Sequence, residues 1–185
     1  RLDDRLPGAP LRPLCAGGAL RGPGHDRLFV GQLRQLFNHR AAKLLGVDLM
    51  TGHWEFTYGM ERVREIVDKE LKGSIEFIAQ NVRTTDFGDP VFAPYAMREV
   101  NGVPVAIVGQ AFPYTPIANP RYMVADWEFG VQEANLQKVV DEARAKGAQL
   151  VVLLSHNGMD VDLKLAGRVR GIDAIFGGHT HDGIP

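Results

Sequence analysis

Apolar runs and amphipathic stretches alternate along the chain from about residue 41 to its last residues. The aliphatic run Leu150 to Leu154 is unbroken, and its length suits a strand that is buried on both faces, as in a parallel sheet. Residues 159–170 carry apolar side chains at roughly helical spacing, and a second apolar run at residues 173–176 ends in Gly177-Gly178. This order of strand, loop, helix and strand predicts a βαβ crossover, which places both strand ends at one edge of a sheet.

The same reading predicts further elements upstream. They are helices at residues 60–72 and 129–146, strands at 74–80, 92–100 and 103–108, and a helix end followed by a short strand within 44–50. Gly73 and Gly147 stand where a glycine would end the two helices. Asn101-Gly102 lies between two apolar runs and is a strong signal for a β-hairpin. The alternation of strands and helices predicts an α/β fold.

Residues 1–40 do not follow these patterns. They are rich in Arg, Pro, Gly and Leu, and neither a strand period nor a helix period persists in them. We expect an irregular segment here, either incomplete or read in a wrong frame. The exception is residues 31–45, where the spacing of the apolar residues is compatible with one helix.

Composition limits the classes of function. A chain of 185 residues forms one domain or most of one, and a net charge of -1 gives no electrostatic case for nucleic acid or an anionic membrane. No apolar run approaches the length of a membrane span, so we expect no membrane insertion. The single cysteine, Cys15, excludes an internal disulfide and a cysteine-rich zinc site.

Histidines follow the predicted strands. His156 comes directly after the run at 150–154 and Ser155, and His179 and His181 follow Gly177-Gly178. If the two strands are parallel, three imidazoles converge at one sheet edge, an arrangement that suits a divalent transition metal. The alternative is that these residues are solvated histidines of polar loops.

A third histidine loop lies upstream. The three loops are Gly52-His53-Trp54-Glu55, Ser155-His156-Asn157-Gly158 and Gly178-His179-Thr180-His181. Their order resembles the calcineurin-like metallophosphoesterases, and within them the 5′-nucleotidase group. The usual third motif of that family is Gly-Asn-His-Glu, so His53 here replaces the Asn ligand and Trp54 replaces the catalytic His. This variant, together with residues 50–51, 56–57, 114–120, 126–130 and 155–162, resembles the SoxB-type thiosulfohydrolases of sulfur oxidation.

The resemblance covers roughly residues 41–185 and implies a partial metallophosphoesterase-like catalytic domain, an α/β sandwich with helices outside two sheets. It implies a periplasmic enzyme with two divalent metal ions, manganese in that family. His53, His156, His179 and His181 would be the metal ligands. The substrate would be an S-sulfonated cysteine of a carrier protein, the SoxYZ complex, and the product sulfate.

Other roles rest on the residues themselves. We predict substrate binding by Trp54 and Asn157, although Trp54 also suits a packing aromatic and Asn157 either a turn residue or a group that orients His156. His53 has the alternative of donating a hydrogen bond to substrate. Glu55 is better explained as a charge at a helix amino terminus than as a ligand.

The family pattern also includes an early Asp-x-His and a Gly-Asp whose carboxylate bridges two metals, and neither precedes Thr51. Gly88-Asp89 follows the His53 loop, in the wrong order. We therefore expect a partial sequence that is itself inactive, although its parent enzyme should be active, and we assign no catalytic residue. Two other functions stay open, a 5′-nucleotidase-like phosphoesterase and a non-catalytic metal-binding domain.

Overall fold

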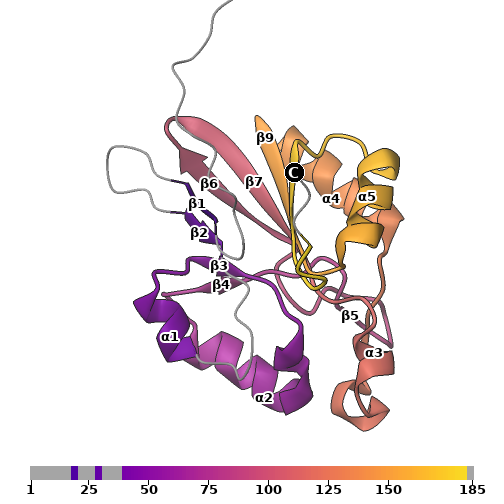
Figure 1. Ribbon diagram of the computed structural model, residues 1–185. Coiled ribbons are helices and arrows are strands. Elements are labelled where there is room, and N and C mark those ends of the chain that lie inside the picture. The colour runs from indigo at the N-terminus through magenta and orange to yellow at the C-terminus, as the bar shows by residue number, and fades with distance from the viewer. Residues whose placement is uncertain (1–17, 21–27, 31–38, 183–185) are drawn as a thin grey trace, which may run out of the picture.

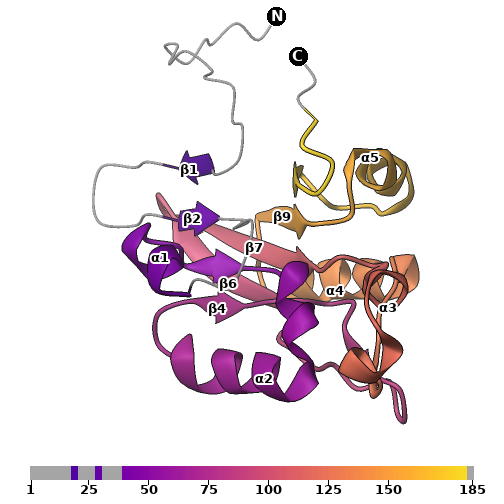
Figure 2. The same cartoon turned by 60° about the horizontal axis from the view of Figure 1, so that its bottom comes forward.

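The protein is an α/β sandwich, in which two β-sheets pack face to face and helices cover their outer faces (Figures 1 and 2). The structure is a computed structural model that describes residues 18–20, 28–30 and 39–182. In chain order the elements are β1 (Gly18–Leu20), β2 (Leu28–Val30), α1 (His39–Leu44), β3 (Leu49–Met50), η1 (Trp54–Tyr58), α2 (Met60–Glu65), η2 (Ile66–Glu70), β4 (Glu76–Phe77), β5 (Arg83–Thr84), β6 (Tyr95–Val100), β7 (Val103–Gln110), α3 (Thr115–Ala118), η3 (Arg121–Val124), β8 (Trp127–Glu128), α4 (Glu133–Ala145), β9 (Leu150–Ser155), α5 (Met159–Arg168) and β10 (Ala174–Gly177).

The first sheet has the strand order β1-β2-β3-β4. Strands β2, β3 and β4 are parallel, and β1 pairs antiparallel with β2. Helix α2 and the π-helical turn η2 cover one face, because Val63, Ile66 and Leu71 fall on one side of the helix and are buried against Met50 and Phe77. This confirms the helix predicted at residues 60–72.

The second sheet has the order β10-β9-β7-β6. Strands β7, β9 and β10 run parallel, so the predicted βαβ crossover through α5 is confirmed. The predicted hairpin joins β6 and β7, with Asn101 at φ 52° and Gly102 at φ 79°, the conformation that this dipeptide adopts readily. Helices α4 and α5 cover the outer face of this sheet (Figure 1).

Side chains on the strands alternate between two cores. On β7, Ala106 and Val108 face the helices, whereas Val105 and Ile107 face the other sheet. The inner core joins both sheets, since Leu49 of β3 packs in the same cluster as Ile107. This two-sided burial explains why the strands have few polar positions, and it confirms the expected sandwich.

The two sheets meet closely at Gly109. The amide of Gln80 donates to the carbonyl of Gly109 at 2.8 Å, and the amide of Gly109 donates to the carbonyl of Pro94 at 3.0 Å. A β-carbon added at Gly109 would lie 2.2 Å from the carbonyl oxygen of Ile78. Glycine is therefore required where the first sheet continues onto the second, and this seam sets the position of one sheet edge relative to the other.

The amino-terminal part differs from its prediction in one respect. Strands β1 and β2 lie within residues 1–40, where no strand was predicted, because three-residue strands are too short to show a period. Of the helix predicted at residues 31–45, α1 covers His39–Leu44, and residues 31–38 lie outside the described residues. The interpretation of residues 1–40 as incomplete or wrong-frame stays a prediction. No helix in the described part combines the length and apolar character that crossing a membrane requires.

Candidate metal centre

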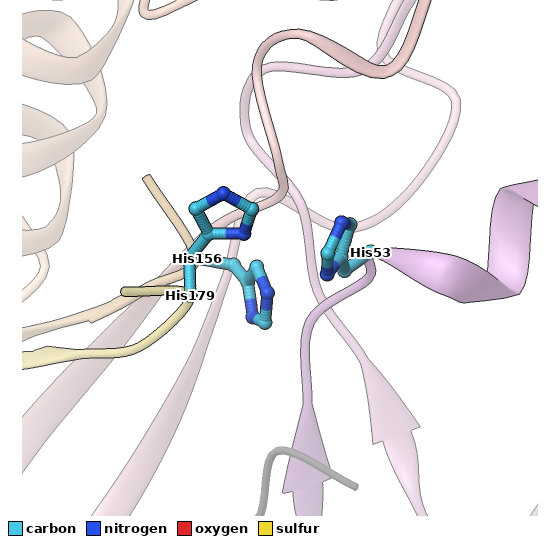
Figure 3. A group of neighbouring side chains, drawn as sticks. All are labelled: His53, His156 and His179. Atoms are coloured by element: carbon cyan, nitrogen blue, oxygen red, sulfur yellow. The ribbon is translucent and has the colours of Figure 1, made fainter. Parts of the chain in front are cut away.

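Three strand ends bring three histidines together. His53 follows β3, His156 follows β9 and His179 follows β10. Figure 3 shows His156 and His179 entering from one side and His53 from the other, with their rings gathered between the two chain segments. The first sheet thus supplies one imidazole and the second sheet supplies two.

The three imidazoles are close enough to share one ion. One ring nitrogen from each lies within 4.8 Å of the others. The ring centroids of His53 and His156 are 4.3 Å apart, and those of His53 and His179 are 4.9 Å apart. Two ligands of one ion at about 2.0–2.1 Å lie up to about 4 Å apart, so small side-chain movements would suffice to close this set around one ion.

The His53 loop is fixed by its neighbours in sequence. A β-carbon on Gly52 would lie 2.8 Å from the rings of Phe56 and Phe77, so glycine lets these rings pack directly against the backbone before His53. The Glu55 carboxylate, which is buried, accepts a 2.6 Å hydrogen bond from the backbone amide of His53. Glu55 therefore lies in the first turn of η1 and holds the loop, which agrees with the predicted position at a helix amino terminus, although burial raises the pKa of its carboxyl and disfavours its charge.

Phe112 is a site residue that the sequence analysis missed. Its ring stacks on His179 at a centroid distance of 4.4 Å and an interplanar angle of 27°, and lies 4.5 Å from the ring of His53. Its amide donates to the carbonyl of Gly52 at 3.0 Å, which ties the loop after β7 to the His53 loop. Position alone gave a signal, because residues 110–112 directly follow a strand whose end lies at the same sheet edge.

Burial keeps the imidazoles neutral. Burial, with smaller contributions from neighbouring histidines, lowers the pKa of His53 to about 4 and that of His156 to about 3. Burial also lowers the pKa of His179, with a smaller contribution from His181. Neutral imidazole is the form that binds a transition metal, so the cluster is ready to bind without first losing protons at pH 7.

Two ring nitrogens lack partners. Nε2 of His156 and Nδ1 of His179 are buried, and neither makes a hydrogen bond within the described part of the protein. A buried polar atom without a partner costs free energy, and a bound metal ion would supply the missing interaction. The three residues therefore fit one divalent ion. No carboxylate of the described residues joins this group, so a second ion needs further ligands.

His181 lies outside the group that the other three histidines form. It is exposed and does not belong to the group of His53, His156 and His179. His179 and His181 have φ angles of 80° and 59°, a left-handed backbone that turns the loop between them. Ligation by His181 stays a prediction.

The two residues predicted to bind substrate differ in their surroundings. Trp54 is 51% exposed, and its ring lies 4.8 Å from that of His53, so it borders the cluster. Asn157 is buried, and its side chain bonds Gln110 and Asp162, whereas Nε2 of His156 has no partner. Substrate binding by either residue stays a prediction.

The chain is similar to known proteins over most of its length. No family model matches the sequence. The chain is 31% identical over 144 residues to the 5′-nucleotidase of Rattus norvegicus, over 75% of this chain and 24% of that protein. The solved structure of sulfate thiohydrolase SoxB from Thermus thermophilus matches with a TM-score of 0.74 and 45% identity, over 79% of this chain and 26% of that one.

A third relative joins these two. A 5′-nucleotidase precursor, also from Thermus thermophilus, matches with a TM-score of 0.65 and 32% identity, over 80% of this chain and 29% of that one. The chain thus spans 24 to 29% of the length of these three relatives. It belongs to the group that contains SoxB and the 5′-nucleotidases, and it shares its fold with a calcineurin-like phosphoesterase of Bacillus subtilis, to which it is 24% identical.

Proposed function

We propose that the protein is a SoxB-type hydrolase, which releases sulfate from an S-sulfonated cysteine of a SoxYZ-type sulfur carrier protein in the periplasm. The observation that carries the proposal is Trp54, which borders three imidazoles at the position where the family's usual motif has a histidine. The 45% identity to SoxB supports the same substrate class.

His53, His156 and His179 would hold a divalent metal ion, and we propose two manganese ions, with His181 as a further ligand. Such ions, when bound, bind a tetrahedral oxyanion and lower the pKa of a bound water. Sulfonate and phosphate are both tetrahedral oxyanions, so the ligands alone do not choose between them.

The leaving group distinguishes a sulfonate substrate from a phosphate ester. An alkoxide that leaves a nucleotide must be protonated, and a catalytic histidine does this in phosphoesterases. A thiol has a pKa of about 8.5 and leaves readily as its anion. Since the indole of Trp54 has no proton to give at pH 7, the site favours a thiolate leaving group.

The proposed reaction balances without a redox partner. The oxygen of water forms a bond to the sulfonate sulfur, and the bond between that sulfur and the cysteine sulfur breaks. Its electron pair leaves on the cysteine thiolate, and the two protons of water are released with sulfate as the product.

A 5′-nucleotidase-like phosphoesterase is the second candidate, favoured by 31% and 32% identity to two 5′-nucleotidases. Assays of the full gene product with an S-sulfonated carrier protein and with AMP separate the two functions. We expect hydrolysis of the carrier only. If AMP is hydrolysed faster than the S-sulfonated carrier, the protein is a 5′-nucleotidase-like phosphoesterase instead. If neither substrate is hydrolysed in metal-supplemented buffer, a non-catalytic metal-binding domain is favoured.

Substitution of Trp54 by histidine tests the chemical argument. Trp54→His restores a proton donor beside His53, so we expect phosphomonoesterase activity to rise by about tenfold to a hundredfold, at or below the lower end of the usual contribution of a general acid. Trp54→Phe is the control, because it keeps an aromatic ring and adds no donor. Equal phosphomonoesterase activity in both variants would reject the leaving-group argument.

A further inference from the structure

Asn157 follows His156 in the sequence, and its side chain forms hydrogen bonds with two other residues. It is 3% exposed, its Oδ1 accepts a 3.1 Å hydrogen bond from Gln110, and its Nδ2 donates at 3.0 Å to Oδ1 of Asp162. The side chain of Asn157, the residue after His156, therefore makes its hydrogen bonds inside the protein.

Gln110 attaches this loop to the middle of the second sheet. Its carbonyl accepts the amide of His156 at 2.9 Å, and its side chain donates to Asn157. Its Oε1 accepts a 2.6 Å bond from Gln80, which is also fully buried and comes from the chain after β4. Buried amides therefore connect the His156 loop with both sheets.

Asp162 bonds the same loop from the first turn of α5. Its Oδ1 accepts hydrogen bonds from the hydroxyl of Ser155 at 2.6 Å and from Asn157. The side chain is 5% exposed, so these bonds form away from water, where a misplaced partner is costly.

Asp162 also packs against the strand that leads to His179. A β-carbon on Gly177 would lie 2.8 Å from Oδ2 of Asp162, so the carboxylate fills the space above that glycine. The two histidine loops touch directly as well, since the amide of Met159 donates to the hydroxyl of Thr180 at 3.2 Å. The side chain of Asp162 thus contacts the segment before His156 and the strand before His179.

We propose that Asn157 and Asp162 are positioning residues, which hold the His156 and His179 loops at the spacing that one metal ion requires. The inference rests on the proposed metal site and adds two residues that do not themselves ligate. Groups of this kind orient metal ligands, and their loss weakens metal affinity by about tenfold to a hundredfold.

Two measurements on the chain test the proposal. The first is Co²⁺ binding by calorimetry and visible absorption for the wild type and for Asn157→Leu, Asp162→Asn and Leu165→Ala. The second is the NMR spectrum of the histidine rings without metal. Leu165 is fully buried on the same helix and contacts the helix-facing core, so its variant reports general destabilisation alone.

We expect Asn157→Leu to weaken Co²⁺ binding by about tenfold to a hundredfold and to split or broaden the ring signals of His156 and His179. Asp162→Asn keeps an oxygen acceptor for Ser155 and Asn157 and should lose less affinity. Unchanged affinity and unchanged ring signals in Asn157→Leu, or equal changes in Leu165→Ala, would overturn the proposal. A wild type that binds no Co²⁺ while Asn157→Leu still alters the ring signals would reject the metal function and keep the positioning role.

Discussion

The two ends of the β-sandwich differ in how their polar groups are satisfied. At the carboxyl ends of β3, β9 and β10, His156 and His179 keep ring nitrogens that are buried without a partner. At the opposite end lies a hollow of about 710 Å³, whose lining includes Asp48, Glu76 and Arg98. There Arg98 and Glu76 form an ion pair at 2.6 Å.

The comparison shows that the hollow does not coincide with the candidate metal site. The hollow is lined by charged side chains, two of which pair with one another, whereas the histidine end holds three imidazoles that are close enough to share one ion. Unsatisfied buried atoms are the more informative feature, because the large majority of buried polar groups are hydrogen-bonded and each exception calls for an explanation, such as a bound ion or water. The predictions below test this contrast.

Removal of His156 should have the largest effect. His156→Ala takes away the most strongly buried ring of the cluster, and we expect Co²⁺ affinity to fall by more than about a hundredfold, beyond the loss typical of residues that only orient ligands. Calorimetric titration measures it. Arg98→Ala at the other end is the control and should leave the affinity unchanged; an equal loss there would contradict the contrast.

Gly109→Ala should disturb the seam between the sheets. The new methyl would meet the carbonyl oxygen of Ile78 at 2.2 Å, and backbone cannot move aside cheaply. We expect the free energy of unfolding to fall by about 2–3 kcal/mol, as for an overpacked core, and metal affinity to fall with it.

Gly167→Ala is the matched control for that seam. Gly167 lies within α5, and a β-carbon there would meet no atom within 4 Å. Gly167 stands in the last turn of α5, so alanine there should raise the free energy of unfolding by up to about 0.5–1 kcal/mol, the value for a helix interior. Urea denaturation measures both variants, and a Gly109→Ala protein as stable as Gly167→Ala would show that the seam is not tight.

The histidine end should also make stability depend on pH. In the unfolded chain an imidazole takes up a proton near pH 6.5, whereas the pKa of His53 is about 4 and that of His156 about 3 in the fold. Between pH 6.5 and 4 the unfolded state therefore binds more protons, so the free energy of unfolding falls as the pH falls. The loss levels off only below the folded pKa values.

Urea denaturation of the metal-free protein at several pH values between about 7 and 4.5 measures this slope. His156→Gln cannot take up the proton, so its slope should be shallower by at most about 1.4 kcal/mol per pH unit. Identical slopes in the two proteins would mean that His156 is protonated in the folded state.

Local patterns predicted the elements that carry the site. The aliphatic run before His156 and the Gly-Gly before His179 placed both rings at one edge, because a βαβ unit leaves little choice of geometry. A spacing of two residues does not specify the left-handed backbone at His179 and His181, so the sequence alone does not say how these two rings lie relative to each other, and ligation by His181 stays a prediction.

Other site features depend on contacts that no local pattern records. Gln80 and Gln110 are fully buried and bond one another across 30 residues of sequence, yet each looks in the sequence like an ordinary polar residue at a strand end. Phe112 reaches the histidines because Asn81 binds both the amide and the carbonyl of Ala111, each at 2.8 Å. Such pairs follow from how the sheets meet, which periodicity does not describe.

The opposite end should give the smallest effect. The side chains of Arg98 and Glu76 are 33% and 41% exposed, so water screens their attraction and the pair contributes at most about 1 kcal/mol. A double-mutant cycle with Arg98→Gln, Glu76→Gln and both together, followed by urea denaturation, measures the coupling. All three variants should bind Co²⁺ like the wild type, because Glu76 begins β4 and Arg98 lies beside it on β6, whereas the histidines follow the carboxyl ends of β3, β9 and β10. A coupling well above about 1 kcal/mol, or weaker metal binding, would mean that the two ends of the sandwich are not independent.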